Sequence, residues 1–214
     1  FVEALHDGNP WIEMYNEFIL SAQFTQARVI FSRHGQMIID HLCADDDEAA
    51  SRLDALFRMF IDAISADIKN WSNVIEHVTM DILPACLSIA EKLVPCLENL
   101  ITALIPLLEY RDSTNWPDNA IKAASSYDTM TKLLVSNGNT PVSQSLLLYG
   151  GSKLSSSSLG GSSSMSRVKK MYYDLIELKR LKEVFECSIS FSVFQTLPSE
   201  GICHKILQNA LTNP

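Results

Sequence analysis

MDILPACLSIAEKLVPCLENLITALIPLLEY, residues 80–110, is the most apolar part of this 214-residue chain. It carries three prolines, Pro84, Pro95 and Pro106, spaced eleven residues apart. A transmembrane helix needs about 20 consecutive, nearly uncharged apolar residues. The longest run without a charged residue here is 99–108, which is ten residues. The segment is therefore predicted to be a buried helix rather than a membrane span.

The proline spacing favours a helical arrangement. Eleven residues make about three helical turns, so the three prolines share one side of a continuous helix. An interior proline removes a backbone hydrogen bond and costs about 3 kcal/mol. We therefore expect Pro84 to open a helix after the preceding one ends near Met80, and Pro95 and Pro106 to kink a buried helix. Apolar residues cover two adjacent faces, which is typical of a helix in the middle of a bundle.

Further helices are predicted on both sides of this segment. Asn9 and Pro10 suit the start of a helix that runs towards Leu42, with Gly35 bending it or ending it early. Acidic residues 45–47 precede the most regular apolar pattern of the chain, between residues 53 and 78. After a polar connector, Pro117 is expected to open a helix that ends near residue 137. Two more helices are predicted at 168–185 and at 199–211.

CSISFSVF, residues 187–194, fits two patterns. Strict alternation of apolar residues with serine predicts a half-buried strand. The four-residue spacing of Phe185, Ile189 and Val193 predicts instead a continuation of the preceding helix. Because no second strand is available for pairing, we favour the helix.

These elements predict an all-α fold, an elongated bundle of long antiparallel helices with a Ser/Gly-rich insertion before the C-terminal helices. Helices of about 30 residues would reach about 45 Å. The predicted domains are a helical bundle at 1–136, a flexible linker or insertion at 137–167, and C-terminal helices at 168–214 that pack on the bundle or beside it. No internal repeat of solenoid length is visible, although a degenerate helical repeat can escape detection in one sequence.

The insertion, residues 137–167, is dominated by Ser and Gly and has no apolar period. Such a composition cannot bury enough apolar surface to offset the entropy of ordering. Leu146, Leu147, Leu148 and Tyr149 form the exception and could dock as a short motif. Phosphorylation of the serines would add negative charge beside the basic start of the following helix, which makes a regulated tether one interpretation and an inert loop the other.

Charge and cysteine content narrow the function classes. Residues 1–164 hold ten Lys and Arg against twenty Asp and Glu, a balance of −10, whereas residues 165–214 hold seven against five, a balance of +2. An acidic body disfavours nucleic acid and anionic membranes. Five cysteines without a C-x-x-C pair indicate thiols in a reducing, cytoplasmic compartment. A first residue of Phe rather than Met suggests a piece of a larger polypeptide.

One short motif points to chemistry. VIFSRHGQM, residues 29–37, resembles the signature of the histidine phosphatase and phosphoglycerate mutase superfamily. The resemblance implies that His34 is a phosphoryl acceptor and Arg33 a phosphate ligand on an α/β fold. It covers about nine residues, and the family's pattern around its second histidine is missing around His204. We keep this reading as a remote alternative.

No catalytic, cofactor-binding or metal site is predicted, because Walker, zinc and EF-hand patterns are absent from the sequence. The leading hypothesis is a non-enzymatic interaction or scaffold domain of a larger intracellular protein. Its partners would be other proteins held by helix-in-groove contacts, with self-association as an option. The alternative is a membrane-associated helical dimerisation module in trafficking. The candidate partner-binding residues are Trp11, Trp116, Leu146, Leu147, Leu148, Tyr149, Lys169 and Lys170.

Overall fold

The computed structural model describes residues 8–44, 46–112, 115–137 and 166–212. Every regular element within these residues is a helix, which confirms the all-α prediction. The α-helices are α1 (Pro10–Leu20), α2 (Phe24–Leu42), α3 (Asp46–Ala66), α4 (Trp71–His77), α5 (Leu83–Ala85), α6 (Ala90–Arg111), α7 (Asp118–Asn137), α9 (Arg167–Phe185), α10 (Phe191–Thr196) and α11 (Ser199–Thr212). Shorter turns link them, namely two 3-10 helices (Ile68–Asn70 and Leu87–Ile89) and a π-helix (Val78–Ile82).

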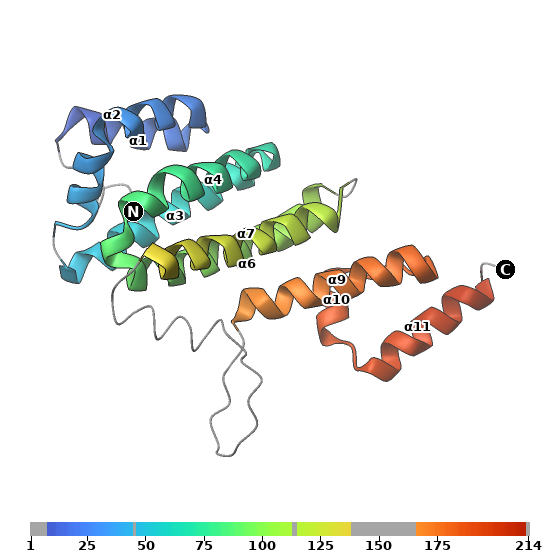
Figure 1. Ribbon diagram of the computed structural model, residues 1–214. Helices are drawn as coiled ribbons and strands as arrows, with labels where there is room; N and C mark the ends of the chain where they lie inside the picture. Colours follow the sequence, from blue (N-terminus) through green and yellow to red (C-terminus); the bar gives the residue numbers. More distant parts are fainter. Residues whose placement is uncertain (1–7, 45, 113–114, 138–165, 213–214) are drawn as a thin grey trace, which may run out of the picture.

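The helices lie in successive layers that follow the order of the chain (Figure 1). Helix α1 packs on α2 and α3, α3 on α6, α6 on α7, and α7 on α9. Buried apolar side chains form one cluster that extends from Ile12 in α1 to Phe191 in α10. Because each layer covers the apolar side of the previous one, the chain forms a stack of helices rather than a bundle around one axis. The longest described helix, α6, has 22 residues, so the prediction of helices near 30 residues was wrong.

The proline-bearing segment is divided between two helices. Helix α6 contains Pro95 and Pro106 in its interior, as predicted. All three prolines are exposed, and the opposite side of α6 is buried against α3 and α7. Pro95 and Pro106 therefore share the solvent side of α6, where a missing hydrogen bond leaves a carbonyl open to water, whereas Pro84 belongs to the separate helix α5. By length and composition residues 87–111 could cross a membrane, but in this fold their apolar positions contact other helices.

Pro84 does not open a helix after Met80, and this prediction was wrong. The backbone continues from α4 through the π-helix into α5, and the interruption comes after Cys86. The Leu83 amide donates to the Val78 carbonyl, five residues back, which widens the turn just before the proline. A wider turn relieves the contact between a proline ring and the carbonyl four residues earlier. Helical backbone can thus pass through Pro84.

The predicted helix from Pro10 towards Leu42 is two helices, α1 and α2, joined by a tight turn. Ala22 has a φ of 56°, and the Gln23 amide donates to the Phe18 carbonyl at 2.7 Å. These are the features of a Schellman helix end, in which the left-handed residue is usually glycine. Because alanine stands at this position, the sequence carried no visible signal for the break.

Gly35, where a bend or an early end was expected, lies inside α2. A Cβ atom added there would come within 3.0 Å of the Phe31 ring. The glycine therefore makes room for a buried aromatic side chain and does not end the helix.

The predicted apolar helix between residues 53 and 78 is also divided. Helix α3 ends at Ala66, and Asp67 then accepts a hydrogen bond from the Lys69 amide at 3.0 Å to start a 3-10 turn. Trp71 opens α4, which turns its apolar side towards α2 and α3. The interruption lets one apolar pattern cover two layers of the stack.

The C-terminal region has the predicted helices at 167–185 and 199–212, but residues 187–194 differ from the helix we favoured. Glu186 adopts a left-handed conformation with a φ of 51°, and α9 ends before it. The next residues are extended until α10 begins at Phe191. Cys187, Ile189 and Phe191 are buried while the serines between them are exposed. The alternating pattern thus marks an extended segment with one buried side, without a partner strand among the described residues.

Candidate functional site: exposed surfaces at the two ends of the stack

Trp11 lies at the N-terminal end of the stack, on the first turn of α1. Its indole stacks on the His34 imidazole of α2, with ring centroids 4.2 Å apart and an angle of 14° between the planes. Trp11 is about 40% exposed, and Met14, one turn further along α1, is also exposed. This end therefore presents an aromatic ring that is fixed on one face and open to solvent on the other.

The same contact bears on the phosphatase-like motif. Arg33, His34 and Gly35 lie in the interior of α2 and not at the end of a strand. The imidazole of His34 is covered by an indole, and the Arg33 side chain is exposed. His204 is exposed on α11, at the other end of the stack (Figure 1). The geometry that the resemblance implied is therefore not formed by these residues.

Trp116 lies between α6 and α7 and contacts the C-terminal helices. Its ring meets that of Phe191 edge to face, with centroids 6.1 Å apart. Its carbonyl accepts a hydrogen bond from Lys182 Nζ at 3.1 Å. Nearby, the Phe191 amide donates to Glu109 Oε1 at 2.6 Å. Trp116 is therefore part of the joint that attaches α9 and α10 to α6 and α7.

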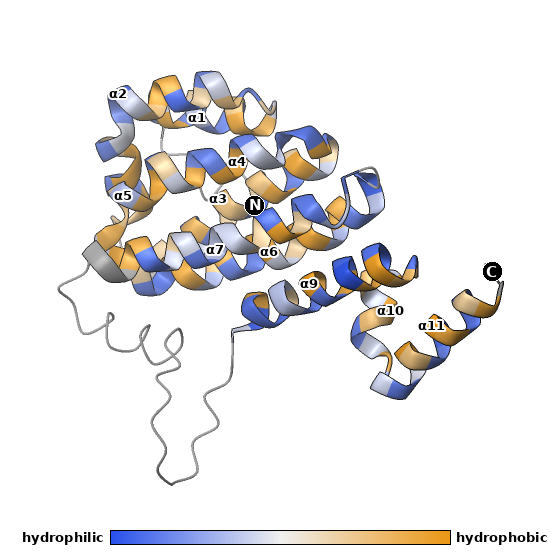
Figure 2. Cartoon of the chain, turned by 45° about the vertical axis from the view of Figure 1, so that its right-hand side comes forward, coloured by the Kyte–Doolittle hydropathy of each residue, from blue (hydrophilic) through white to orange (hydrophobic). Residues whose placement is uncertain are grey.

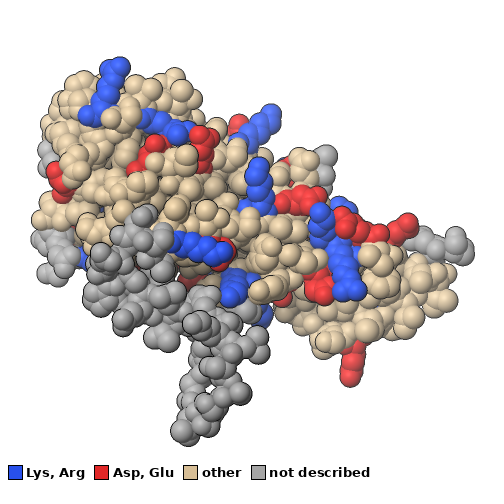
Figure 3. Space-filling view, in the orientation of Figure 1, with Lys and Arg blue, Asp and Glu red and all other residues tan. Residues whose placement is uncertain are grey.

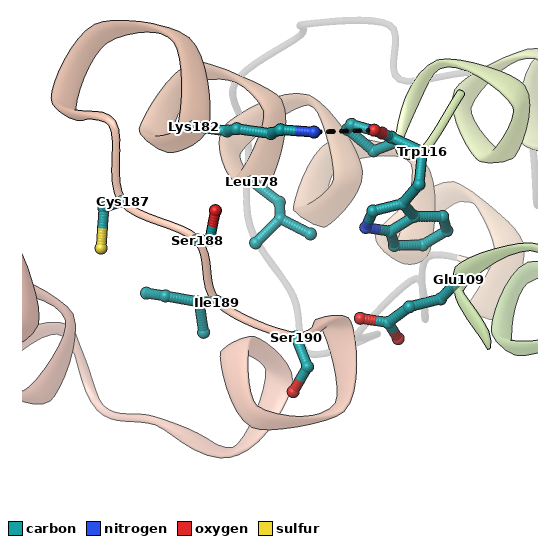
Figure 4. Close-up of a pocket in the computed structure, with 9 residues that line it drawn as sticks. Glu109, Trp116, Leu178, Lys182, Cys187, Ser188, Ile189 and Ser190 are labelled. Atoms are coloured by element: carbon teal, nitrogen blue, oxygen red, sulfur yellow. Dashed lines mark hydrogen bonds between the residues drawn. The ribbon is translucent and has the colours of Figure 1, made fainter. Parts of the chain in front are cut away.

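A cavity of about 200 Å³ opens at this joint (Figure 4). It is lined on one side by Glu109 and Trp116 and on the other by Leu178, Lys182 and the extended residues 187–190. Both charged side chains already bind backbone groups across the joint, so the remaining lining is mostly apolar. Such a cavity can accept an apolar side chain more readily than a charged ligand.

Lys169 and Lys170 lie in the first turn of α9, just after the N-cap Ser166, whose hydroxyl accepts from the Lys169 amide at 3.2 Å. Lys170 is exposed and Lys169 half-buried. Figure 3 shows Lys and Arg side chains interleaved with Asp and Glu over α9, without an extended basic patch on the visible face. The remaining candidates, Leu146, Leu147, Leu148 and Tyr149, lie outside the described residues.

One surface was missed from the sequence. Helix α9 buries one side against α6 and α7, yet Tyr173, Ile176 and Val184 form a second apolar stripe on its outer side, between 41 and 62% exposed. Leu207 and Leu211 of α11 are 63 and 83% exposed. Figure 2 shows apolar residues along both α9 and α11. The three- and four-residue spacings were the available signal, but the buried stripe of α9 follows the same period and masked it.

Two titratable groups near the joint have raised pKa values. The pKa of Lys179 is raised by its hydrogen bond to Asp118, at 2.6 Å, which links α9 to α7. Burial, together with the nearby charge of Glu98, raises the pKa of Tyr127 to about 12. Among the described residues no three His, Cys, Asp or Glu side chains gather in a way that could hold a metal ion.

The layered helices suggest a repeat architecture, since such stacks are built from helical hairpins that contact their neighbours in turn. The sequence pattern of one family, described as the KNTC1 first ARM-repeats domain, matches residues 1–121. The chain belongs to this family. The described part of the matched region comprises α1 to α6 and the first residues of α7, and the family's description names a helical repeat that was not visible in the sequence.

The chain is also 74% identical, over all 214 residues, to the kinetochore-associated protein rod-1 of Caenorhabditis elegans. It spans about 10% of the length of that relative. No solved structure matches the chain. The family description agrees with the helical character of the leading hypothesis.

Proposed function

We propose that this chain is a protein-interaction scaffold within a kinetochore-associated protein. The observation that carries the proposal is the 74% identity over the whole chain to a relative with that description. At this identity the buried layers and the exposed end surfaces are expected to be shared. An ARM-repeat stack presents side chains from several helices on one surface, which suits it to hold partner proteins rather than to convert a substrate.

The proposed contacts lie at the two ends of the stack. Trp11 supplies a rigid aromatic side chain of the type that carries much of the energy in protein interfaces. Lys169 and Lys170 supply positive charge beside an otherwise acidic body, and Leu146–Tyr149 and Trp116 remain candidates. The outer stripe of α9 has the spacing that a partner helix would meet in helix-in-groove binding. Proteins are the favoured partners, because the acidic balance of residues 1–164 disfavours nucleic acid.

Location and regulation follow from the same proposal. All five cysteines are thiols, and Cys86, Cys96 and Cys187 are buried, which suits a reducing compartment such as the cytoplasm or the kinetochore region. We retain the division into 1–136, 137–167 and 168–214 as a proposal. Phosphorylation of the serine-rich part would regulate how it tethers the C-terminal helices to the N-terminal part. A dimer or larger assembly is a further option, which light scattering of the 23.9 kDa chain would test directly.

A cross-linking experiment tests the scaffold. The full-length protein, captured from dividing cells, is treated with a lysine-reactive cross-linker and digested for mass spectrometry. We expect Lys169 and Lys170 to form cross-links to another protein and Lys132, which is 75% exposed on α7, to serve as the matched control. Exclusively intrachain cross-links from Lys169 and Lys170 would contradict the proposed contact.

A localisation experiment tests the wider proposal. Fluorescently tagged full-length protein with Trp11→Ala is compared with Met80→Ala, which removes another exposed large side chain, in dividing cells. We expect the wild type and Met80→Ala to gather at kinetochores and Trp11→Ala to lose one or more captured partners. A wild type that never gathers at kinetochores would overturn the kinetochore part of the proposal.

A further inference from the structure

A hydrogen-bond network centred on a buried histidine joins α1, α2, α4 and the π-helix. His77, at the end of α4, has a side chain with no exposed surface. Its Nε2 lies 2.8 Å from the hydroxyl of Tyr15 on α1, and its Nδ1 lies 2.8 Å from Oδ2 of Asp81 in the π-helix. The same Asp81 oxygen accepts from Arg28 Nε of α2 at 2.7 Å, and Arg28 Nη1 reaches Glu76 at 2.5 Å.

The geometry sets the positions of the protons. The ionised Asp81 carboxylate can only accept, so His77 Nδ1 must donate to it. In a neutral imidazole Nε2 is then an acceptor, and the Tyr15 hydroxyl must donate to it. With these protons both ring nitrogens and the hydroxyl are satisfied, as buried polar groups require.

The surroundings of His77 leave little room for another arrangement. Rings of Phe31 from α2 and Phe60 from α3 meet the imidazole edge to face, at centroid distances of 5.5 and 5.9 Å. Arg28 from α2 and Asp81 from the π-helix are the charged groups bonded to the network, and Glu76 pairs with Arg28. From α1 the titratable group that faces His77 is Tyr15. Tyr15 interacts electrostatically with the Cys86 thiol next to α5, and Cys86 interacts in the same way with Cys43.

The neutral state is favoured by burial. Desolvation lowers the pKa of His77, opposed by its hydrogen bond to Asp81 and assisted by the positive charge of Arg28. Burial raises the pKa of Tyr15 well above its ordinary value, so the phenol also stays neutral. A second proton on His77 would make Nε2 a donor. The hydrogen of the Tyr15 hydroxyl would then have to turn away from Nε2, towards a site lined by aromatic rings.

We propose that Tyr15, His77, Asp81 and Arg28 form a latch that holds the α1–α2 hairpin on α3 and α4 only while His77 is neutral. Protonation reverses the Tyr15 contact, because Nε2–H then donates to the hydroxyl oxygen and the phenolic hydrogen loses its buried acceptor, which weakens the docking of α1. Since α1 and α2 form the first layer of the stack, they can loosen without unfolding α6, α7 and α9. The latch is thus an acid-sensitive joint for the surface that carries Trp11.

The direction of the pH effect follows from linkage. An unfolded histidine has a pKa of about 6.5, and that of folded His77 is lower. Between the two values the undocked state binds more protons, so docking is complete above pH 6.5 and weakens as the pH falls below it. Most carboxylates titrate below pH 5, so the range from 7.5 to 5.5 isolates histidine.

Hydrogen exchange on the 214-residue chain tests the latch. Protection factors, each corrected for the intrinsic exchange rate at its own pH, are measured at pH 7.5 and 5.5. We expect a loss of protection at pH 5.5 in α1 and α2, with α6, α7 and α9 unchanged. His204→Gln, which alters an exposed histidine on α11, should behave like the wild type.

Two variants separate the latch from a general acid effect. His77→Gln should remove the difference between pH 7.5 and 5.5 in α1 and α2. Should that variant fail to fold, NMR titration of the His77 imidazole replaces it, with Asp81→Asn expected to move the midpoint to lower pH because the carboxylate favours the charged ring. A loss of protection that persists in His77→Gln, that spreads equally to α7 and α9, or an imidazole midpoint unmoved by Asp81→Asn would overturn the proposal.

Discussion

The first layers of the stack and the last layers differ in how completely their helices are buried. Helices α3 and α6 each pack between neighbouring helices, and their fully buried side chains include Phe60 of α3 and Leu97 of α6. Helices α9 and α11 cover one side only and leave Tyr173, Ile176 and Leu207 in water. The first region also buries a satisfied polar network, whereas the described polar contacts of α9 to α11 are mostly exposed. Stability is therefore expected to fall from α3 towards α11, which leaves the last layers free to meet partners.

The sharpest way to test this gradient is a pair of truncations. Phe60→Ala removes a side chain with no exposure that contacts Phe57 and the His77 ring, so the free energy of unfolding should fall by about 3–5 kcal/mol. Leu207→Ala on α11 should change it by less than about 0.5 kcal/mol. Urea unfolding followed by circular dichroism measures both. Equal losses would contradict the gradient.

The polar network offers the next largest effect. Tyr15→Phe keeps the ring but leaves Nε2 of the buried His77 without its donor, which should cost about 1–3 kcal/mol at pH 7.5. Tyr110→Phe, at a position that is 84% exposed, is the control and should be neutral. Unfolding in urea at a fixed pH compares them. A neutral Tyr15→Phe would show that the network adds little to the first layers.

A local change in the joint tests the other end. Glu109→Ala removes the carboxylate that accepts from the Phe191 amide and should weaken the docking of α10 by about 1–2 kcal/mol. Because the contact lies at the joint, exchange should quicken in α9 and α10 while α1 and α2 keep their protection. Glu91→Ala, an exposed position on α6, is the matched control. Faster exchange in α1 would indicate that the two ends are coupled.

The smallest expected effect is chemical and leaves the fold intact. Cys203 on α11 is exposed, whereas burial raises the pKa of Cys86 to about 12 and that of Cys96 to about 11. At pH 8 a thiol reagent should therefore modify Cys203 in the native chain and reach Cys86 and Cys96 only on unfolding. Mass spectrometry after timed labelling reports the order. Early modification of Cys96 would show that α6 opens more readily than α11.

Local patterns in the sequence predicted several features because their physical cause is local. The eleven-residue spacing placed Pro95 and Pro106 on one side of a helix, and the structure shows that side of α6 exposed. Asn9 as N-cap was confirmed, since its side chain accepts from the Trp11 amide. The start of α9 near residue 168 and the helix from 199 were also predicted. Each of these follows from turn geometry or from apolar spacing within one helix.

Features that depend on distant residues escaped the sequence. The turn at Ala22 uses a left-handed alanine, and glycine would have been the usual signal. Of the candidate site residues, Trp11 is partly exposed and Trp116 belongs to the joint. The sequence predicted neither the contact of Trp116 with Phe191 nor the outer stripe of α9. Those positions depend on which side of a helix meets a neighbour.

What the amino-acid order settles here is the helical class, the common side of Pro95 and Pro106 and the starts of several helices, because these depend on contacts within a few turns. The three-dimensional packing settles where long apolar patterns break, in which order the layers stack and which apolar stripe stays in water. It also brings Tyr15 to His77 across 62 residues of sequence. No local periodicity contains that information, because burial and hydrogen-bond partners exist only once separate helices have met.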